Sequence, residues 1–212
     1  ISFYRDEREE YVNPDDGIIM IGDQDGSGGA PNDGDLILAG SPFPDFYGGL
    51  ANNMSFKNFD LSMFFQFSYG NEIYNATRSW MENLKLNDRT IIGTNTTQAA
   101  FDNRWQQPGD ITRYPGVNYD GRNDNYTLPH TGWLEDGSYL RLKSLTFGYT
   151  FDSTLLSKLN LNSARIYLTA NNLLTFTNYS GFDPEVDHFT GVNGGANSGL
   201  LRGYDYGSYP QA

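Results

Sequence analysis

The acidic, glycine-rich stretch of residues 22–35 carries the side chains best suited to bind a metal ion. Five of them offer oxygen ligands: Asp23, Asp25, Ser27, Asp33 and Asp35. The first three alternate along the chain and are followed by Gly28, as in the first half of an EF-hand calcium loop. Position twelve of that pattern is Gly34 instead of a bidentate glutamate. The sequence predicts a calcium site formed by the five residues, with simple turn formation as the alternative.

A second group of residues could bind an organic molecule through flat aromatic faces. It lies in the polar segment 70–137 and consists of Trp80, Trp105, Trp133, Tyr114, Tyr119 and Tyr126. Aromatic side chains commonly line binding pockets, and here they could stack on sugar rings or pack on peptides. The alternative is that they pack within and between the loops. We expect a substrate-binding role for this group.

The remaining residues argue against several kinds of site. No cysteine occurs, which excludes disulfides, thiolate zinc sites and cysteine nucleophiles. The two histidines, His130 and His188, lie far apart, and no nucleophile-elbow, dinucleotide-binding or phosphate-loop motif occurs. The net charge of −12 disfavours a nucleic-acid partner. We therefore predict a protein that is not an enzyme and requires no cofactor, with calcium as the one candidate ion.

These candidate residues must be positioned by β-strands. In 59–69 the bulky residues fall on one parity, namely Phe59, Leu61, Met63, Phe65, Phe67 and Tyr69. Such a period of two is typical of a strand with one apolar face. Comparable patterns predict four strands, near 45–56, 59–69, 138–151 and 164–176. The long loops expected between and around them are 5–44, 70–137 and 177–212.

The length of these strands bears on the class of β protein. Segment 59–69 has 11 residues, enough to cross the lipid-facing band of about 25 Å in a membrane barrel, whereas ordinary strands have about 5 or 6. Phe46, Tyr47, Phe67 and Tyr69 would then form an aromatic girdle near one end. No apolar run is long enough for a membrane-spanning helix. The pattern leaves a membrane barrel and a large soluble β domain both open.

The predicted strand 138–151 contains a conflict between its two halves. Leu145, Phe147 and Tyr149 are apolar on one parity, and extending that parity backwards places Arg141 and Lys143 on the same face. A charged side chain at the midplane of a barrel's lipid face costs about 2 to 4 kcal/mol. Either a β-bulge near Ser144 exchanges the faces, or this half of the strand lies above the membrane.

Three blocks of sequence follow one another in a fixed order. The first combines FDLSMFFQ at 59–66 with GNEIYN at 70–75, the second is DGSYLRLKSLTFGY at 136–149, and the third combines RIY at 165–167, NNLLTFT at 171–177 and YSGFDPE at 179–185. In this order they resemble segments of the SusC/RagA-type TonB-dependent outer-membrane transporters. The resemblance covers roughly residues 13–212.

The resemblance implies an all-β fold, namely the C-terminal part of a large antiparallel transmembrane barrel of about 22 strands with long extracellular loops. Residues 1–212 would be a fragment of that one barrel domain, in the bacterial outer membrane. We expect the chain to begin within a longer protein, without the plug domain and without the last strand. The side chains expected to face the lumen are Asp60, Ser62, Gln66, Thr146 and Thr150.

The resemblance also implies a function, which is TonB-dependent import of oligosaccharides or peptides. The implied partners are the rest of the barrel and its plug, a SusD/RagB-like surface lipoprotein, the TonB complex acting through the N-terminal region, and outer-membrane lipid. Two other functions stay open on the residues alone. One is a soluble carbohydrate-binding β module, and the other is a secreted glycosidase, which needs two carboxylates about 5 to 9.5 Å apart.

Overall fold

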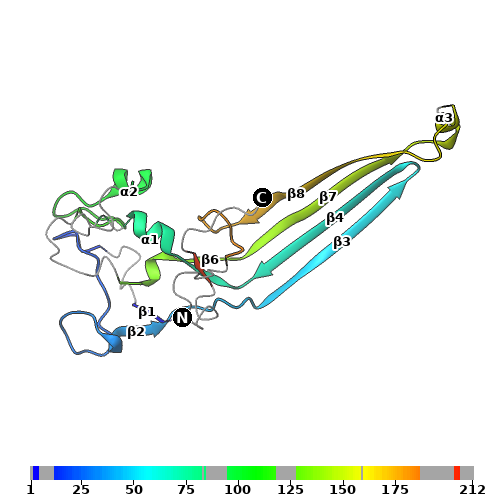
Figure 1. Ribbon diagram of the computed structural model, residues 1–212. Coiled ribbons are helices and arrows are strands. Elements are labelled where there is room, and N and C mark those ends of the chain that lie inside the picture. The colour runs from blue at the N-terminus through cyan, green and yellow to red at the C-terminus, as the bar shows by residue number, and fades with distance from the viewer. Residues whose placement is uncertain are drawn as a thin grey trace, which may run out of the picture. The chain divides into compact units, whose positions relative to one another are not determined.

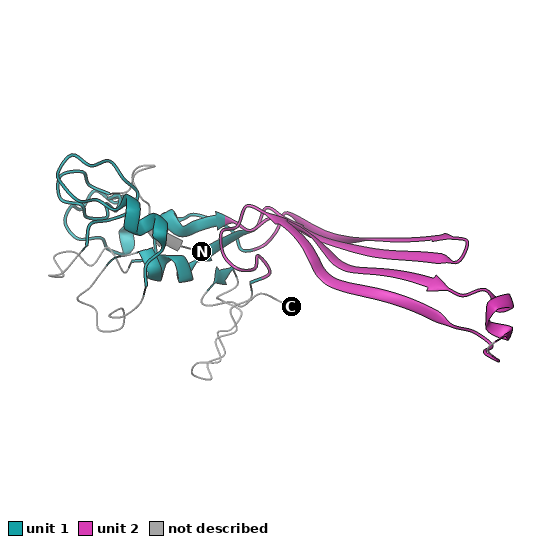
Figure 2. Cartoon of the chain, turned by 90° about the horizontal axis from the view of Figure 1, so that it is seen from above, with its two compact units in different colours: residues 1–42, 72–135, 186–208 teal, residues 43–71, 136–185, 209–212 magenta. Residues whose placement is uncertain are grey.

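The computed structural model describes residues 2–4, 12–82, 84, 95–117, 128–158, 160–186 and 203–205. The chain divides into two compact units, shown in different colours in Figure 2. Unit 1 comprises residues 1–42, 72–135 and 186–208, and unit 2 comprises residues 43–71, 136–185 and 209–212.

Unit 2 is built on one long antiparallel sheet. Its strands are β3 (Phe46–Phe56), β4 (Phe59–Tyr69), β7 (Tyr139–Thr150) and β8 (Arg165–Thr177), paired in the order β3-β4-β7-β8. Figure 1 shows the four strands side by side over their whole length. The alternation of bulky and small residues explains why these segments are extended, since a period of two places every second side chain on the same face. The four strands predicted from the sequence are found at these positions.

The two short connections of the sheet lie at the same end. Residues 57 and 58 join β3 to β4, and Lys57 has a positive φ of 55°, as a tight hairpin turn requires. The connection from β7 to β8 contains α3 (Ser153–Ser157), which follows Asp152. The Asn58 side-chain amide donates to Asp152 Oδ1 at 2.7 Å. The hairpin turn and the α3 connection are thereby joined.

Unit 1 consists of short elements. β1 (Ser2–Tyr4) pairs with β2 (Leu36–Leu38), and β6 (Leu134–Asp136), β5 (Glu72–Asn75) and β9 (Tyr204–Asp205) form a second small sheet in that order. The helices are α1 (Ala76–Glu82) and α2 (Gln98–Asn103), and the 3-10 turns are η1 (Asp33–Asp35) and η3 (Thr131–Trp133). The segments predicted as loops therefore contain short strands and helices.

The buried core of the described residues lies in unit 1. It is formed by Val12, Ile19, Tyr74, Ala76 and Trp133, with further apolar side chains packed around them. The sheet of unit 2 differs, because many of its large apolar side chains are exposed. Among the described residues no helix is long and apolar enough to cross a membrane.

Candidate functional site

The long sheet has one apolar face and one polar face. Strand register assigns the apolar face as follows: Phe46, Leu50, Met54 and Phe56 from β3, Phe59, Leu61, Met63, Phe65, Phe67 and Tyr69 from β4, Leu140, Leu142, Leu145, Phe147 and Tyr149 from β7, and Ile166, Leu168, Leu174 and Phe176 from β8. Leu168 is 73% exposed and Phe56 is 70% exposed. An apolar surface of this extent is unusual on a soluble monomer. It favours contact with lipid over contact with water.

Aromatic side chains gather at both ends of the apolar face. At one end Phe46 stacks on Tyr69, with ring centroids 4.9 Å apart, and meets Phe67 edge-on. At the other end Phe59 contacts Phe147 and Tyr149, with centroid distances of 5.7 and 4.8 Å. Two aromatic belts separated by a mainly aliphatic zone are the pattern of a lipid-facing barrel wall.

Tyr47 does not belong to the belt in which the sequence placed it. It pairs with Ser68 and therefore lies on the polar face, while its neighbour Phe46 pairs with Tyr69 on the apolar face. The correction follows from strand geometry, since adjacent residues point to opposite faces.

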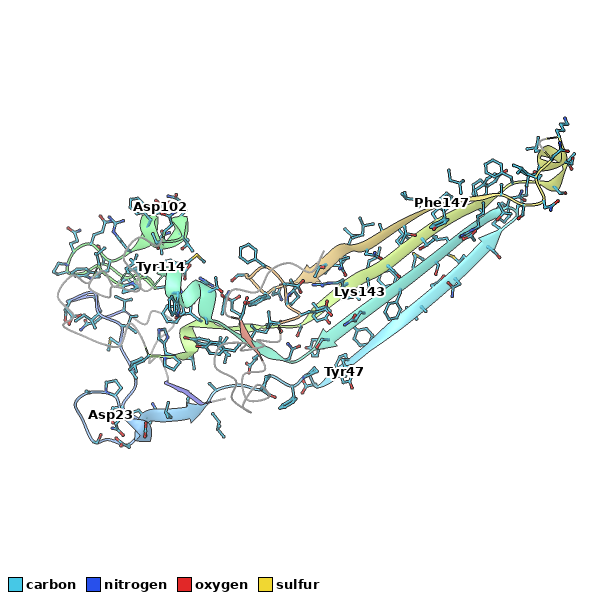
Figure 3. All side chains as sticks on the ribbon, in the orientation of Figure 1. Asp23, Tyr47, Asp102, Tyr114, Lys143 and Phe147 are labelled. Atoms are coloured by element: carbon cyan, nitrogen blue, oxygen red, sulfur yellow. The ribbon has the colours of Figure 1, made fainter. Side chains whose placement is uncertain are left out.

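A β-bulge at Lys143 resolves the conflict within β7. Leu142 pairs with Phe65 and Ser144 pairs with Phe64, so Lys143 is an extra residue between two adjacent partners on β4. The bulge exchanges the faces of the strand at this point. Arg141 consequently pairs with Gln66 on the polar face. Of the two alternatives drawn from the sequence, the bulge is confirmed, and Figure 3 marks Lys143 and Phe147 on this strand.

The polar face carries all five residues expected to face a lumen. Asp60, Ser62 and Gln66 come from β4, and Thr146 and Thr150 come from β7. Register pairs Ser62 with Thr146, and Thr146 shares a hydrogen bond of 3.1 Å with Thr169 of β8. Ser62 also donates to Asn53 Oδ1 at 2.6 Å. The five side chains therefore lie on one polar face of the sheet.

An ion pair crosses β7 near the hairpin end of this surface. Arg165 of β8 donates to both carboxylate oxygens of Asp60 on β4, at 3.1 and 2.5 Å. Between them lies Gly148, where a Cβ atom would stand 2.4 Å from Arg165 Nη2 and 2.5 Å from Asp60 Oδ1. The ion pair thus requires a residue without a side chain at position 148.

A charged cluster that the sequence did not predict lies at the other end of the polar face. Arg141 bonds Asp183 Oδ1 at 2.7 Å and Glu185 Oε2 at 2.5 Å, and Lys143 bonds Glu185 Oε2 at 2.8 Å. Gln66 donates to the second oxygen of Glu185 at 2.9 Å. The Arg141 side chain is only 3% exposed. The signal in the sequence was the pair of basic residues in β7 and the acidic YSGFDPE segment, but nothing there showed that they meet.

The structure describes four of the six aromatic candidates of segment 70–137, and two of these, Trp105 and Trp133, pack in the core of unit 1. Trp133 is 1% exposed and donates its indole N–H to Glu82 at 3.4 Å, and Trp105 donates its indole N–H to the Pro14 carbonyl at 2.9 Å. Both support the packing alternative. Trp80 on α1 is 43% exposed, Tyr114 is half-buried, and Tyr119 and Tyr126 lie outside the described residues.

Three of the five calcium candidates converge in the loop before β2. Ligand oxygens of Asp23, Asp25 and Asp35 lie within 4.8 Å of one another. Asp35 is buried and accepts hydrogen bonds from the backbone N–H groups of Gln24 and Asn32. Hydrogen bonds from Ser27 lower the pKa of the exposed Asp25 carboxyl. Asp33 is not a member of the converging set, and Ser27 donates its backbone N–H to Asp25 Oδ1 at 2.9 Å, so the loop offers three converging carboxylates.

His130 is a buried side chain packed within unit 1. It is fully buried, stacks on Trp133 with ring centroids 4.1 Å apart, and accepts the Gly132 N–H through Nδ1. Burial lowers its pKa to about 3, so the ring is neutral at physiological pH. His188 lies outside the described residues.

Comparison with known proteins identifies relatives of one kind. No protein-family model matches the chain. It is 37% identical over 196 residues to TonB-dependent receptor P3 of Formosa agariphila, an alignment that covers 92% of the chain and 18% of that receptor. It is 26% identical over 168 residues to the TonB-dependent receptor SusC of Bacteroides thetaiotaomicron, which covers 79% of the chain and 15% of SusC. The chain thus spans less than a fifth of the length of these relatives.

Solved structures agree with the sequence comparison. The match to a structure of the RagAB peptide importer in the open-open state covers 86% of this chain and 19% of the importer chain, with a TM-score of 0.68 and 25% identity. The match to a structure of the RagAB peptide transporter covers 99% of this chain and 21% of the transporter chain, with a TM-score of 0.69 and 23% identity. This second match shows the fold. With its two-faced sheet and these relatives, the chain belongs to the SusC/RagA-type TonB-dependent transporters and corresponds to one portion of such a protein.

Proposed function

We propose that the complete protein imports oligosaccharides or peptides across the bacterial outer membrane in a TonB-dependent manner. One structural observation carries the proposal, namely a long sheet that is apolar with two aromatic belts on one face and polar on the other. A transporter wall needs this arrangement because one face must meet lipid while the other lines an aqueous path. The names of the TonB-dependent receptors and of the RagAB peptide importer support it.

In this proposal the sheet is part of a closed barrel of about 22 strands around a plug. The apolar face meets outer-membrane lipid, and Asp60, Ser62, Gln66, Thr146 and Thr150 line the lumen. The long segments 5–44, 70–137 and 177–212 lie outside the cell, and the turn at residues 57 and 58 lies in the periplasm. A SusD/RagB-like lipoprotein would close over the outer mouth, and the TonB complex would act on the N-terminal region.

The cargo is an oligosaccharide or a peptide, and the described residues favour neither. The barrel wall provides general hydrogen-bonding groups, whereas selection between the two classes belongs to loops and to the lipoprotein. Trp80 is the candidate for direct contact with cargo, because this residue is 43% exposed while Trp133 is buried.

Uptake by the source bacterium tests the proposal. The gene is deleted, restored on a plasmid, and the cells are supplied with defined pools of labelled oligosaccharides or peptides. We expect deletion to abolish uptake of one of the two pools, the plasmid to restore it, and a protonophore to abolish it again. Unchanged uptake of both pools in the deletion strain would contradict the proposal.

The two rival functions predict different behaviour of the purified full-length protein. A soluble carbohydrate-binding module would stay in solution without detergent, whereas the transporter should fractionate with the outer membrane. A glycosidase would release reducing ends from oligosaccharides, whereas we expect no hydrolysis.

A further inference from the structure

The segment that follows β8 turns back onto the polar face of its own sheet. This return segment comprises residues 178–185. At its start Thr177 donates to the Ser138 carbonyl at 2.8 Å, and its Oγ1 accepts the Tyr179 N–H at 3.1 Å. Tyr179 is 5% exposed and packs so closely over Gly181 that a Cβ atom there would stand 2.4 Å from the ring. The return segment therefore has a defined conformation of its own.

The charged cluster ties the far end of the return segment to two strands. Glu185 Oε1 accepts from Gln66 of β4 at 2.9 Å and from the Tyr139 hydroxyl of β7 at 3.2 Å. Glu185 Oε2 accepts from Arg141 and Lys143 of β7. Register places Gln66, Tyr139 and Arg141 on the polar face. The return segment consequently lies over that face and not over the lipid-facing one.

Arg141 is the central residue of this attachment. A buried guanidinium is tolerated only when it is paired, and here Asp183 and Glu185 of the return segment supply both carboxylates. Asp183 is itself 4% exposed, and its Oδ1 also accepts the Glu185 N–H at 2.8 Å. The burial of the Arg141 side chain therefore depends on its ion pairs with Asp183 and Glu185. If Arg141 lost its charge, two carboxylates would be left on the sheet without their main partner.

We propose that the return segment is a fixed ledge on the lumen wall, positioned by Arg141, which narrows the path through the barrel and so limits the size of the cargo. This inference rests on the proposed function, because the polar face is the lumen wall only in a transporter. Arg141 acts as a positioning residue: it touches the ledge and not the cargo.

Attachment is tested first by hydrogen exchange in the full-length transporter in detergent, with Arg141→Gln as the variant. We expect peptides covering residues 178–186 to exchange severalfold faster in Arg141→Gln, while peptides within β4 and β8 are unchanged. Arg165→Gln is the matched control, because it removes another arginine of the polar face without touching the return segment, and exchange of residues 178–186 should stay as in the wild type. Unchanged exchange in Arg141→Gln would overturn the attachment. Asp183→Asn breaks the same pair from the other side and replaces Arg141→Gln if that variant fails to assemble.

Cargo size is tested next, with a graded series of oligomers of the transported class. Release of the ledge should raise the largest size taken up and leave the uptake rate of the smallest oligomers unchanged. A released ledge with an unaltered size limit would overturn the proposed role. The two measurements are separate, since exchange reports on the ledge even if the wild-type protein imports nothing.

Discussion

At the scale of single residues, the face on which a side chain lies decides what it can tolerate. Met63 and Ser62 are neighbours in β4, yet Met63 pairs with Asn52 and Leu145 on the apolar face and Ser62 pairs with Thr146 on the polar face. A substitution at one position should therefore have a different effect from the same substitution one residue away.

We predict that Met63→Arg lowers the stability of the full-length barrel by about 2 to 4 kcal/mol, because it places a cation on the lipid face near mid-strand. Ser62→Arg should have little effect, since its side chain lies on the polar face. The measurement is unfolding by urea in lipid vesicles. The folded fraction is read from the difference in gel mobility between the folded and the unfolded barrel. Equal losses in the two variants would mean that the faces are assigned wrongly.

The buried His130 gives unit 1 a dependence on pH. Its pKa is about 3 in the folded chain and 6.5 in its ordinary state, so the unfolded state takes up a proton first as the pH falls. Above pH 6.5 the ring is neutral in both states, and the free energy of unfolding does not depend on its protonation. Between pH 6.5 and about pH 3 the free energy of unfolding falls by roughly 1.4 kcal/mol per pH unit.

His130→Asn should flatten that slope, because asparagine keeps a capping oxygen for the Gly132 N–H and does not titrate in this range. The measurement is the protection factor against hydrogen exchange of peptides covering residues 130–136, between pH 4 and pH 7. An equally steep loss in wild type and variant would assign the pH dependence to other groups.

The converging carboxylates of Asp23, Asp25 and Asp35 keep the calcium prediction testable. Calorimetric titration of the full-length transporter with calcium should show a site that Asp25→Asn weakens by roughly tenfold or more. Asp33→Asn is the control, because Asp33 lies in the same loop and is not among the three converging residues. If Asp25→Asn and Asp33→Asn bind calcium as the wild type does, the loop is a turn stabilised by its own hydrogen bonds.

At the scale of elements, the bulge in β7 allows one strand to carry both an apolar and a basic half. Deleting Lys143 would remove the extra residue and leave Leu142 opposite Phe65 and Ser144 opposite Phe64, so the other side chains of β7 keep their faces. We predict that the barrel without Lys143 assembles, whereas deletion of Leu142 instead lowers assembly, because Lys143 then pairs with Phe65 on the apolar face.

The readout is the amount of folded, protease-resistant protein in the outer membrane. Equal assembly of the two deletion variants would show that the strand can form a bulge at another position.

How far the sequence predicts these elements depends on the range of the forces involved. Alternation along β3 and β4 is a local signal, so the strands and the faces of Asp60, Ser62 and Gln66 could be predicted. The bulge could only be stated as one of two alternatives, because the pattern of β7 does not show how it pairs with β4. The charged cluster was beyond prediction, since Gln66 and Glu185 are 119 residues apart. The burial of Trp133 likewise depends on its packing with residues distant in sequence, such as Val12 and Ile19.

At the scale of the whole molecule, the sheet of unit 2 has two outer strands, β3 and β8, each with one neighbour. Backbone N–H and C=O groups along those outer edges have no partner strand among the described residues. In hydrocarbon each such group costs several kcal/mol, which is why membrane sheets close on themselves. We predict that residues 1–212 expressed alone do not insert into lipid vesicles as a stable monomer.

The measurement is a refolding experiment of this chain beside the full-length protein, scored by resistance to protease and by mass. A protected monomer of 23.8 kDa would show that four strands are sufficient, and it would remove the argument for a larger barrel.

The order of the strands also has a consequence for how the sheet forms in time. Of these four strands, each pairs with the one that comes before or after it in the chain. The connections between paired strands differ greatly in length: 2 residues join β3 to β4, whereas 69 residues lie between β4 and β7. Closing a longer loop loses more chain entropy before any pairing is gained. Two bonds close the long connection, from the Gly70 N–H to Ser138 Oγ at 3.0 Å and from the Gly137 N–H to the Asn71 carbonyl at 2.8 Å. We expect the β3-β4 and β7-β8 hairpins to form early. Pairing of β4 with β7 should be the slow step, because it requires the long connection to close.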